Sequence, residues 1–391
     1  MTDQRGEIVF TKLDRVIHGR PAAEAVVAEA DRLGAERVFI LSSRSLNRDT
    51  DEVATVTRAL GGRFAGLCDH MPSHSPRDAV VDCANQAAEA GTDLLVTIGG
   101  GSVTDGGKAV TLCLKHGIRD MDGMEAFRTV VDEQGKRHFP DYTAPDVRQI
   151  VVPTTLSAGE FNARAGVTDP RHGLKQAYIH PGLIPAAIVL DPAITVATPE
   201  WLWLSTGIRA VDHAVETYLS LDANPYTDGA ALHALKLLGE GLPATKRDPN
   251  DLAARRKCLF GAWLSMTGIV TGTRLGASHA IGHVLGGAAN VPHGHTSCIM
   301  MPYVLAFNAT VNGDRQKDIA AAMGRAGEAA DQVLDRFIAD LDQPRRLRDT
   351  GLGDNRLAEI AEKALLDDWT FSNPRPLKTA EDVMEILRAA Y

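Results

Sequence analysis

The sequence predicts an α/β domain built on a parallel sheet, followed by an all-helical domain. At 391 residues the chain is too long for one ordinary hydrophobic core, so two domains are expected. Up to about residue 190, helix-like and strand-like segments alternate, which is typical of a parallel sheet covered by helices on both faces. After Asp191-Pro192 the composition becomes helical. We therefore expect domains at residues 1–193 and 194–391.

The elements of the first domain follow from their apolar patterns. A helix is expected to begin beside Ser75, with Pro76 at its first position and Asp78 in its first turn, and to end at Gly91. Residues 118–147 interrupt the alternation with Gly, Asp and Pro and predict a surface excursion. The other expected helices are 22–33 and 46–60, and the expected strands are 37–42, 63–67, 94–98, 150–152 and 187–190.

The second domain is expected to contain helices only. Thr198-Pro199-Glu200 is a helix start, because a capping hydroxyl, a proline and an acid follow one another. Helical periodicity then covers residues 230–241, 251–270, 315–341 and 380–390.

A glycine run follows the expected strand 94–98. Gly99, Gly100, Gly101 and Ser102 precede Gly106-Gly107-Lys108, where we expect a helix to begin. Bare backbone N–H groups at a helix N-terminus favour an anion, so the run indicates a phosphate or dinucleotide site. A tight turn without a ligand is nearly as good an explanation. The run matches neither G-x-G-x-x-G nor a P-loop, because Ala109 follows Lys108.

Histidines gather in the second half of the chain. His279 and His283 are four residues apart and share one helix face, and His213 and His293 lie in two other glycine-containing segments. Neutral imidazole is a common metal ligand. Taken singly, each histidine is more simply a capping or core residue, but four together indicate an active site.

Composition excludes several classes of protein. A net charge of −9 argues against a nucleic-acid partner, and no stretch has the apolar length of a membrane span. The polar N-terminus lacks the apolar core of a signal peptide. The five cysteines are scattered without a C-x-x-C pair, so we expect reduced thiols, no disulfide, no cysteine metal site, and a cytoplasmic location.

The chain resembles the iron-containing (group III) alcohol dehydrogenases, and within them the maleylacetate reductase branch. The resemblance covers essentially the whole chain. It rests on GGGSVTDGGKA at 99–109, PTT at 153–155, IVLDP at 188–192, residues 207–216, HAIGH at 279–283 and VPH at 291–293. Three further segments are similar to the maleylacetate reductases: His70-Met71-Pro72, Gly261-Ala262-Trp263 and Asn373-Pro374-Arg375-Pro376.

The resemblance implies a fold like that of iron-type alcohol dehydrogenases and dehydroquinate synthases, with hydride transfer to or from NAD(P) in a cleft between the domains. Residues 99–102 would bind the pyrophosphate, and His283 would relay a proton beside the nicotinamide. His213, His279 and His293 would form the inherited triad, holding substrate or a metal. The residues expected around the ribose and nicotinamide are Asp105, Thr154, Thr155 and Lys175.

One position departs from the metal-dependent pattern. Arg209 stands where those enzymes carry an aspartate, four residues before His213. A guanidinium repels a dication. The maleylacetate reductases also lack the aspartate, and the resemblance to them implies an enzyme that works without a required metal. We therefore expect an enzyme without bound iron or zinc rather than one with it. We also expect Arg209 to bind a substrate carboxylate as a planar fork. Pairing of Arg209 with Glu216 or Asp212 is nearly as good an explanation.

Coenzyme choice is predicted from the end of the second strand. Ser43 stands where NAD-preferring members carry an acid, and Arg44 adds a cation. These residues favour or tolerate the 2′-phosphate of NADP.

The resulting prediction is an NAD(P)H-dependent reductase of an anionic oxo-acid or conjugated carbonyl, in which His283, Arg209 and His213 are catalytic. The protein is expected to be a homodimer that acts on a small molecule. The alternatives are a metal-dependent alcohol dehydrogenase or aldehyde reductase, a zinc hydrolase, and a non-catalytic dinucleotide-binding relative.

Overall fold

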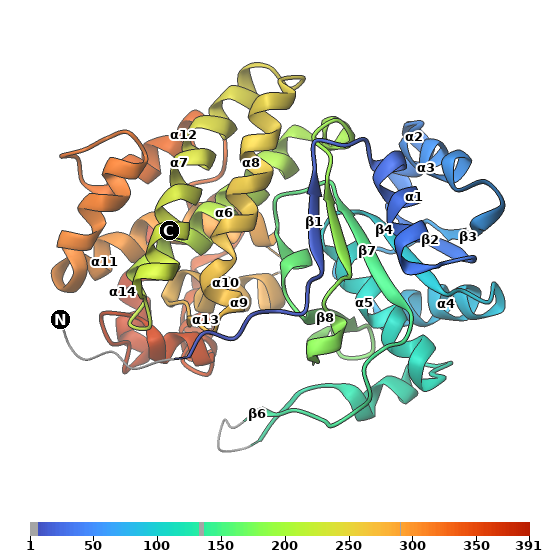
Figure 1. Ribbon diagram of the computed structural model, residues 1–391. Helices are drawn as coiled ribbons and strands as arrows, with labels where there is room; N and C mark the ends of the chain where they lie inside the picture. The colour runs from blue at the N-terminus through green and yellow to red at the C-terminus, as the bar shows by residue number, and fades with distance from the viewer. Residues whose placement is uncertain (1–6, 133–136, 290) are drawn as a thin grey trace. The chain divides into compact units, whose positions relative to one another are not determined.

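A computed structural model describes residues 7–132, 137–289 and 291–391, and its chain divides into two compact units. The sheet unit comprises Lys12–Trp203 and Asp248–Leu259. The helical unit comprises Leu204–Arg247, Phe260–Tyr391 and the described residues up to Thr11. Figure 1 labels the helices and strands of both units and colours the chain from blue at the N-terminus to red at the C-terminus.

The sheet unit contains a six-stranded sheet in which every pairing is parallel. In spatial order its strands are β1 (Arg15–His18), β10 (Ala187–Leu190), β7 (Arg148–Pro153), β4 (Leu94–Gly99), β2 (Val38–Ser42) and β3 (Phe64–Cys68). The adjacent inner strands β2 and β4 are buried throughout. Such continuous apolar strands are typical of a parallel sheet covered on both faces, so the predicted fold class is confirmed.

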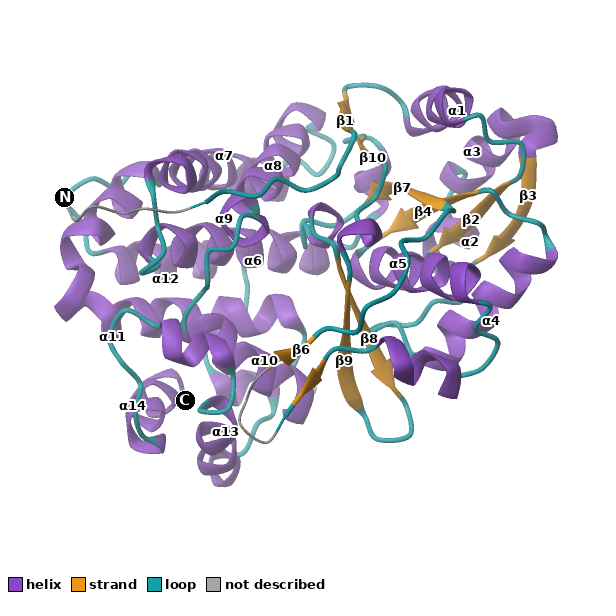
Figure 2. Ribbon diagram, turned by 60° about the horizontal axis from the view of Figure 1, so that its bottom comes forward, coloured by secondary structure: helices purple, strands orange, loops and turns teal. Residues whose placement is uncertain are grey.

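Alternate residues of β2 enter two different hydrophobic cores. Phe39 and Leu41 pack in the core that includes side chains of α4 (Arg77–Glu89) and α5 (Gly101–His116). Val38 and Ile40 pack in the core that includes side chains of α1 (Ala22–Leu33) and α3 (Glu52–Leu60). Figure 2 shows α1 and α3 together beside one side of the sheet, and α4 and α5 beside the other.

Several predicted boundaries are wrong. The helix predicted at 46–60 is two helices, α2 (Arg44–Asp49) and α3, because Thr50 has an extended backbone. The sequence reading missed the antiparallel hairpin of β8 (Arg164–Asp169) and β9 (Leu174–Ile179). The expected excursion at 118–147 contains a short 3₁₀ helix, Asp122–Phe127, and the two-residue strands β5 (Val130–Val131) and β6 (Arg137–His138).

The helical unit is built from helices, with short 3₁₀ turns between some of them. Its α-helices are α6 (Glu200–Leu219), α7 (Pro225–Arg247), α8 (Leu252–Ser265), α9 (Thr267–Val270), α10 (Ala277–Ala289), α11 (His293–Ala322), α12 (Ala330–Asp340), α13 (Leu357–Ala364) and α14 (Ala380–Ala390). The first residues of α6, up to Trp203, and those of α8, up to Leu259, are counted with the sheet unit. The helix predicted at 315–341 is interrupted where Gly324 and Gly327 adopt positive φ. Among the described residues, no helix is both long and apolar enough to cross a membrane.

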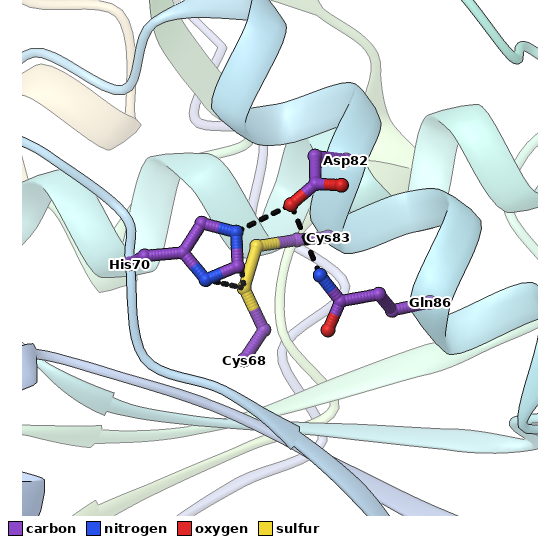
Figure 3. Close-up of a disulfide and its surroundings, with 5 residues drawn as sticks. All are labelled: Cys68, His70, Asp82, Cys83 and Gln86. Carbon is purple, nitrogen blue, oxygen red and sulfur yellow. Dashed lines mark hydrogen bonds and ion pairs between the residues drawn. A yellow bond between two sulfur atoms is a disulfide. The ribbon is translucent and has the colours of Figure 1, made fainter.

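The expectation that all cysteines are reduced is wrong for one pair. Cys68, the last residue of β3, forms a disulfide with Cys83 of α4 (Figure 3). Fifteen residues separate the two in sequence, and only the packing of α4 against the end of β3 brings them together. Cys113, Cys258 and Cys298 are free and buried.

Candidate active site

The glycine run joins β4 directly to α5. Gly99 ends the strand, Gly100 is the N-cap, and α5 begins at Gly101. The helix thus starts five residues before the predicted position at Gly106, and the run itself forms its first turn. The first N–H groups of an α-helix have no partner within the helix, and the helix dipole is positive at this end. The run therefore has the features of an anion site.

Close packing also requires these glycines. A Cβ at Gly99 would lie 2.8 Å from Val103 Cγ2, and one at Gly100 would lie 3.0 Å from Thr155 Cγ2. A Cβ at Gly101 would lie 3.0 Å from the Ser157 hydroxyl oxygen. The sequence left two explanations for the glycine run, a tight turn and an anion site. The structure is compatible with both at once.

The structure brings several predicted cofactor residues to this end of the sheet. Thr154 N–H donates to Gly99 O at 3.0 Å, which places Thr154 and Thr155 beside the run. Ser102 Oγ accepts the N–H of His74 at 3.0 Å. Ser43 N–H donates to Ile98 O at 3.2 Å, so the carboxyl end of β2 lies beside that of β4, with Arg44 exposed at the start of α2.

Asp105 and Lys175 approach one another over Gly166. Asp105 Oδ2 accepts the N–H of Gly166 at 3.0 Å. A Cβ at Gly166 would lie 2.4 Å from Lys175 Cε and 3.4 Å from Asp105 Oδ2. The side chain of Lys175 therefore lies against Gly166 of β8, next to Asp105.

Lys108 has a structural role instead of a phosphate-binding one. Its side chain is fully buried, and Nζ donates to Gly159 O at 2.7 Å and to Arg164 O at 2.9 Å. The ammonium thereby ties α5 to the segment that precedes β8. This agrees with the absence of a P-loop motif around Lys108.

The buried carboxyl of Glu160 lies near Lys108, and its raised pKa can be tested. Burial raises the pKa of its carboxyl from 4.5 to about 7. Between these values the folded protein retains a proton that the unfolded chain has released, so stability falls as pH rises through this window. The difference in free energy of unfolding between Glu160→Gln and the wild type should therefore favour the variant more at pH 8 than at pH 5, by at most roughly 3 kcal/mol. Urea unfolding of both proteins at both pH values measures this, and an equal difference at the two pH values would contradict it.

The predicted histidines lie on adjacent helices of the helical unit. Arg209 and His213 are on α6, His279 and His283 are on α10, and His293 begins α11. The rings of His213 and His279 stack with centroids 4.9 Å apart. A Cβ at Gly286 of α10 would lie 2.7 Å from His293 Cε1, so that imidazole packs directly against α10.

His213 and His279 are held uncharged. Burial is the main cause that lowers both pKa values well below 6.5, and the charge of Arg209 lowers them further. His213 Nδ1 and His279 Nε2 are buried atoms without a hydrogen-bond partner. A buried nitrogen lone pair without a donor is costly in a folded protein, and a ligand that accepts its electrons removes that cost.

Glu216 holds His279 in place. The carboxylate on α6 accepts the N–H groups of Gly276 at 3.1 Å and Ser278 at 2.8 Å, and it bonds His279 Nδ1 at 2.8 Å. It therefore caps α10 from a neighbouring helix and fixes the tautomer of His279, so that Nε2 carries the lone pair. Burial raises the pKa of Glu216 to about 7, and burial also raises that of Asp212, which accepts from the Ser278 hydroxyl at 2.7 Å.

Sequence reasoning did not assign Glu216 a role in the site. The available signal was its position on the same helix, three residues after His213. The sequence also missed Asp367, which bonds His283 Nδ1 at 2.9 Å, and Trp369, whose ring centroid lies 5.0 Å from that of His283. No local pattern marks these two residues, because tertiary packing brings the segment near residue 370 to α10.

Arg209 lies beside this cluster and is partly buried. Its Nη1 is 3.4 Å from His293 O and 3.5 Å from Ser297 Oγ, and its charge partly offsets the burial that raises the pKa of Asp212. The guanidinium is therefore directed toward the start of α11, on the side of α6 that carries the site.

The structure does not gather the predicted histidine triad into one tight ligand set. In the described part of the chain, Asp212, Glu216 and His279 have potential ligand atoms all within 4.8 Å of one another. So do Cys68, His70 and Cys83. His213 and His293 belong to neither group.

Comparisons with known proteins agree with this architecture. Residues 14–192 match the family model for iron-containing alcohol dehydrogenases, and residues 203–391 match the C-terminal model of the same family. The chain is 33% identical to dehydrogenase ALT3 of Alternaria alternata, over 91% of this chain and 99% of that protein. It is 31% identical to maleylacetate reductase 2 of Cupriavidus pinatubonensis, over 96% and 94% of the two chains.

A solved structure shows the same fold. The crystal structure of maleylacetate reductase from Rhizobium sp. strain MTP-10005 superposes with a TM-score of 0.82 at 27% identity, and covers 99% of each chain.

The matches overturn the prediction about the metal. Both family models describe iron-containing enzymes, which implies bound iron as well as NAD(P). The prediction that no metal is the better expectation is therefore wrong. It rested on the charge of Arg209 and on the resemblance to the maleylacetate reductases, and took no account of the uncharged, buried nitrogens beside Arg209.

The residues present fit a metal. The imidazoles of His213 and His279 are uncharged, His213 Nδ1 and His279 Nε2 lack partners, and Glu216 supports the opposite nitrogen of His279. A carboxylate behind an imidazole is a common arrangement of metal-binding histidines. These features make His213 and His279 suitable metal ligands.

Proposed function

Since the chain belongs to the iron-containing alcohol dehydrogenase family and is an NAD(P)-dependent oxidoreductase, we propose that it reduces an anionic oxo-acid of the maleylacetate type. The observation that carries this proposal is Arg209, a partly buried cation one helical turn before His213. A guanidinium binds a carboxylate through two parallel hydrogen bonds, whereas an uncharged aldehyde offers it no such partner. The similarity to maleylacetate reductases supports the same substrate class.

The cofactor is assigned to the sheet unit. Residues 99–102 bind the pyrophosphate through backbone N–H groups at the start of α5. Ser43 and Arg44 receive the adenosine ribose and its 2′-phosphate. The nicotinamide end is assigned to Asp105, Thr154, Thr155 and Lys175.

The substrate is assigned to the helical unit. Arg209 binds the substrate carboxylate, and His213, His279 and His293 hold the metal, which as a Lewis acid would polarise the carbonyl oxygen. His283 relays the proton to the product oxygen, and Asp367 orients its ring through Nδ1. Trp369 packs against the His283 ring and limits the access of water.

Interconversion of an uncharged alcohol and its aldehyde remains a second candidate function. The two partnerless histidine nitrogens favour it, because a metal can activate a carbonyl that carries no carboxylate. The zinc hydrolase and the non-catalytic relative are not retained, since the family assignment makes the chain an oxidoreductase.

Steady-state kinetics test substrate and coenzyme together. We expect the purified enzyme to oxidise NADPH with an oxo-dicarboxylate at a higher kcat/KM than with an uncharged aldehyde of similar length. We expect NADPH to serve at least as well as NADH, because Arg44 can pair with a 2′-phosphate. Arg44→Ala should raise the KM for NADPH and leave that for NADH unchanged. A strong NADH preference in the wild type would show that Ser43 and Arg44 were misassigned.

We also propose a homodimer located in the cytoplasm, where small-molecule substrate and nicotinamide coenzyme are both present. Sedimentation equilibrium measures the oligomeric state, and a monomer at micromolar concentration would exclude the dimer.

A further inference from the structure

A cluster of metal-ligand side chains lies in the sheet unit, separate from the groups assigned to the reaction. Cys68 ends β3, His70 follows two residues later, and Cys83 lies on α4 (Figure 3). One donor atom from each lies within 4.8 Å of the others. The two sulfurs are joined as a disulfide.

The imidazole of His70 packs against the sulfurs. Its Nδ1 lies 3.6 Å and its Nε2 3.9 Å from Cys68 Sγ, and Nε2 also contacts Asp82 Oδ2 on α4. Gln86 Nε2 donates to the same oxygen at 3.0 Å and fixes that carboxylate (Figure 3). A disulfide needs no oriented imidazole, but a metal-binding histidine typically has a carboxylate behind its ring.

The distances suit a tetrahedral zinc-type ion. Bond lengths of about 2.3 Å to sulfur and 2.0–2.1 Å to nitrogen place a thiolate and an imidazole nitrogen roughly 3.6 Å apart across a tetrahedral edge. This agrees with the 3.6 Å between Cys68 Sγ and His70 Nδ1. The same geometry requires the two sulfurs to be roughly 3.8 Å apart, so the disulfide must be opened first.

The surroundings allow an ion to enter and be retained. Cys68 and Cys83 are buried, with 1% and 0% of their surfaces exposed, and the His70 side chain is 32% exposed. The sulfurs are thus shielded from solvent, and His70 provides the approach. With three protein donors, one position stays open for water.

We propose that Cys68, His70 and Cys83 form a redox-gated site for a zinc-type divalent cation. A cellular thiol opens the site: two thiols reduce the disulfide to two cysteine thiols and leave as their own disulfide. Binding of the divalent ion then releases both cysteine protons and forms two sulfur–metal bonds and one nitrogen–metal bond. Asp82 is a positioning residue that holds the ring of His70. In the reverse step a low-molecular-weight disulfide is the oxidant: it takes the two electrons and two protons from solvent, leaves as two thiols, and the re-formed protein disulfide releases the ion.

Cobalt(II) titration of the full-length protein tests this proposal, because sulfur-to-cobalt charge transfer reports thiolate ligands and the histidine site has none. After phosphine reduction, the wild type should develop near-ultraviolet absorption that saturates with one cobalt at this site. The oxidised protein and Cys83→Ala should not develop it, whereas Cys258→Ala, the matched control at another buried cysteine, should. Asp82→Asn should weaken cobalt binding by roughly 10- to 100-fold.

Two results would overturn the proposal. One is a fully reduced wild type that binds cobalt without charge-transfer absorption. The other is an absorption that persists in Cys83→Ala. Circular dichroism and NADPH binding verify that each variant is folded. Should Cys83→Ala fail to fold, Asp82→Asn decides alone, because that side chain is 57% exposed, and unchanged cobalt affinity would reject the assigned geometry.

Discussion

Replacement of Gly100 by valine is expected to abolish binding of the nicotinamide cofactor. Gly100 is the N-cap of α5, and a Cβ there already lies 3.0 Å from Thr155 Cγ2. The branched side chain would occupy the path by which the pyrophosphate approaches the backbone. Loss of two hydrogen bonds to the charged phosphates, at about 1.5 to 3 kcal/mol each, corresponds to a weakening of roughly 100-fold or more.

Fluorescence titration with NADPH measures this effect. The matched control is Gly62→Val, since a Cβ at Gly62 meets nothing within 4 Å. Gly62 lies before the first residue of β3, whereas the glycine run follows the last residue of the parallel strand β4. The control should bind NADPH as the wild type does. Thermal unfolding verifies that Gly100→Val is folded, and Gly100→Ala serves if it is not. Unchanged affinity in a folded variant would reject the glycine run as the pyrophosphate site.

Removal of the metal is expected to eliminate activity. His213 Nδ1 and His279 Nε2 are the buried atoms that would lose a ligand, and carbonyl polarisation by a metal is worth several kcal/mol, or about 100-fold or more in rate. Prolonged dialysis against a chelator should inactivate the enzyme, and one equivalent of iron(II) per chain should restore it.

Elemental analysis separates metal loss from unfolding. The wild type should lose one iron with its activity, and His279→Ala should contain none at this site. Glu216→Gln should bind iron more weakly, by about 10- to 100-fold, because the support of His279 Nδ1 changes. Full activity in protein shown to be free of metal would contradict this account.

The sheet was predictable from the sequence because its strands are continuous apolar runs between turn residues. The position of the glycine run was predicted for the same reason, although α5 begins at Gly101 and not at Gly106. Periodicity could not place that boundary, because glycines inside a helix resemble a loop. The β8–β9 hairpin was missed because charged and polar residues such as Arg164, Lys175 and Gln176 obscure its alternation.

The site was predictable only where its residues occur in short segments. His279 and His283 were found because they are four residues apart on one helix. Asp367 and Trp369 lie more than 80 residues from His283, and nothing local marks them. The disulfide of Cys68 and Cys83 has the same cause, since only the fold brings the two residues together.

The prediction about the metal failed for a different reason. It judged one changed position, Arg209, by its charge and by the resemblance to the maleylacetate reductases. Burial decides the state of His213 and His279, and it keeps both imidazoles neutral beside that cation. The arginine at position 209 therefore did not reveal whether His213 and His279 can still bind a metal.

The most direct test of the central claim compares two substrates in the wild type and in Arg209→Ala. The account predicts that the variant raises KM for the oxo-dicarboxylate by roughly 10- to 100-fold, because a charge-assisted pair contributes about 1.5 to 3 kcal/mol. KM for an uncharged carbonyl of similar size should stay nearly unchanged. If both KM values rise equally, Arg209 has a structural role, and the assignment of an anionic substrate is contradicted.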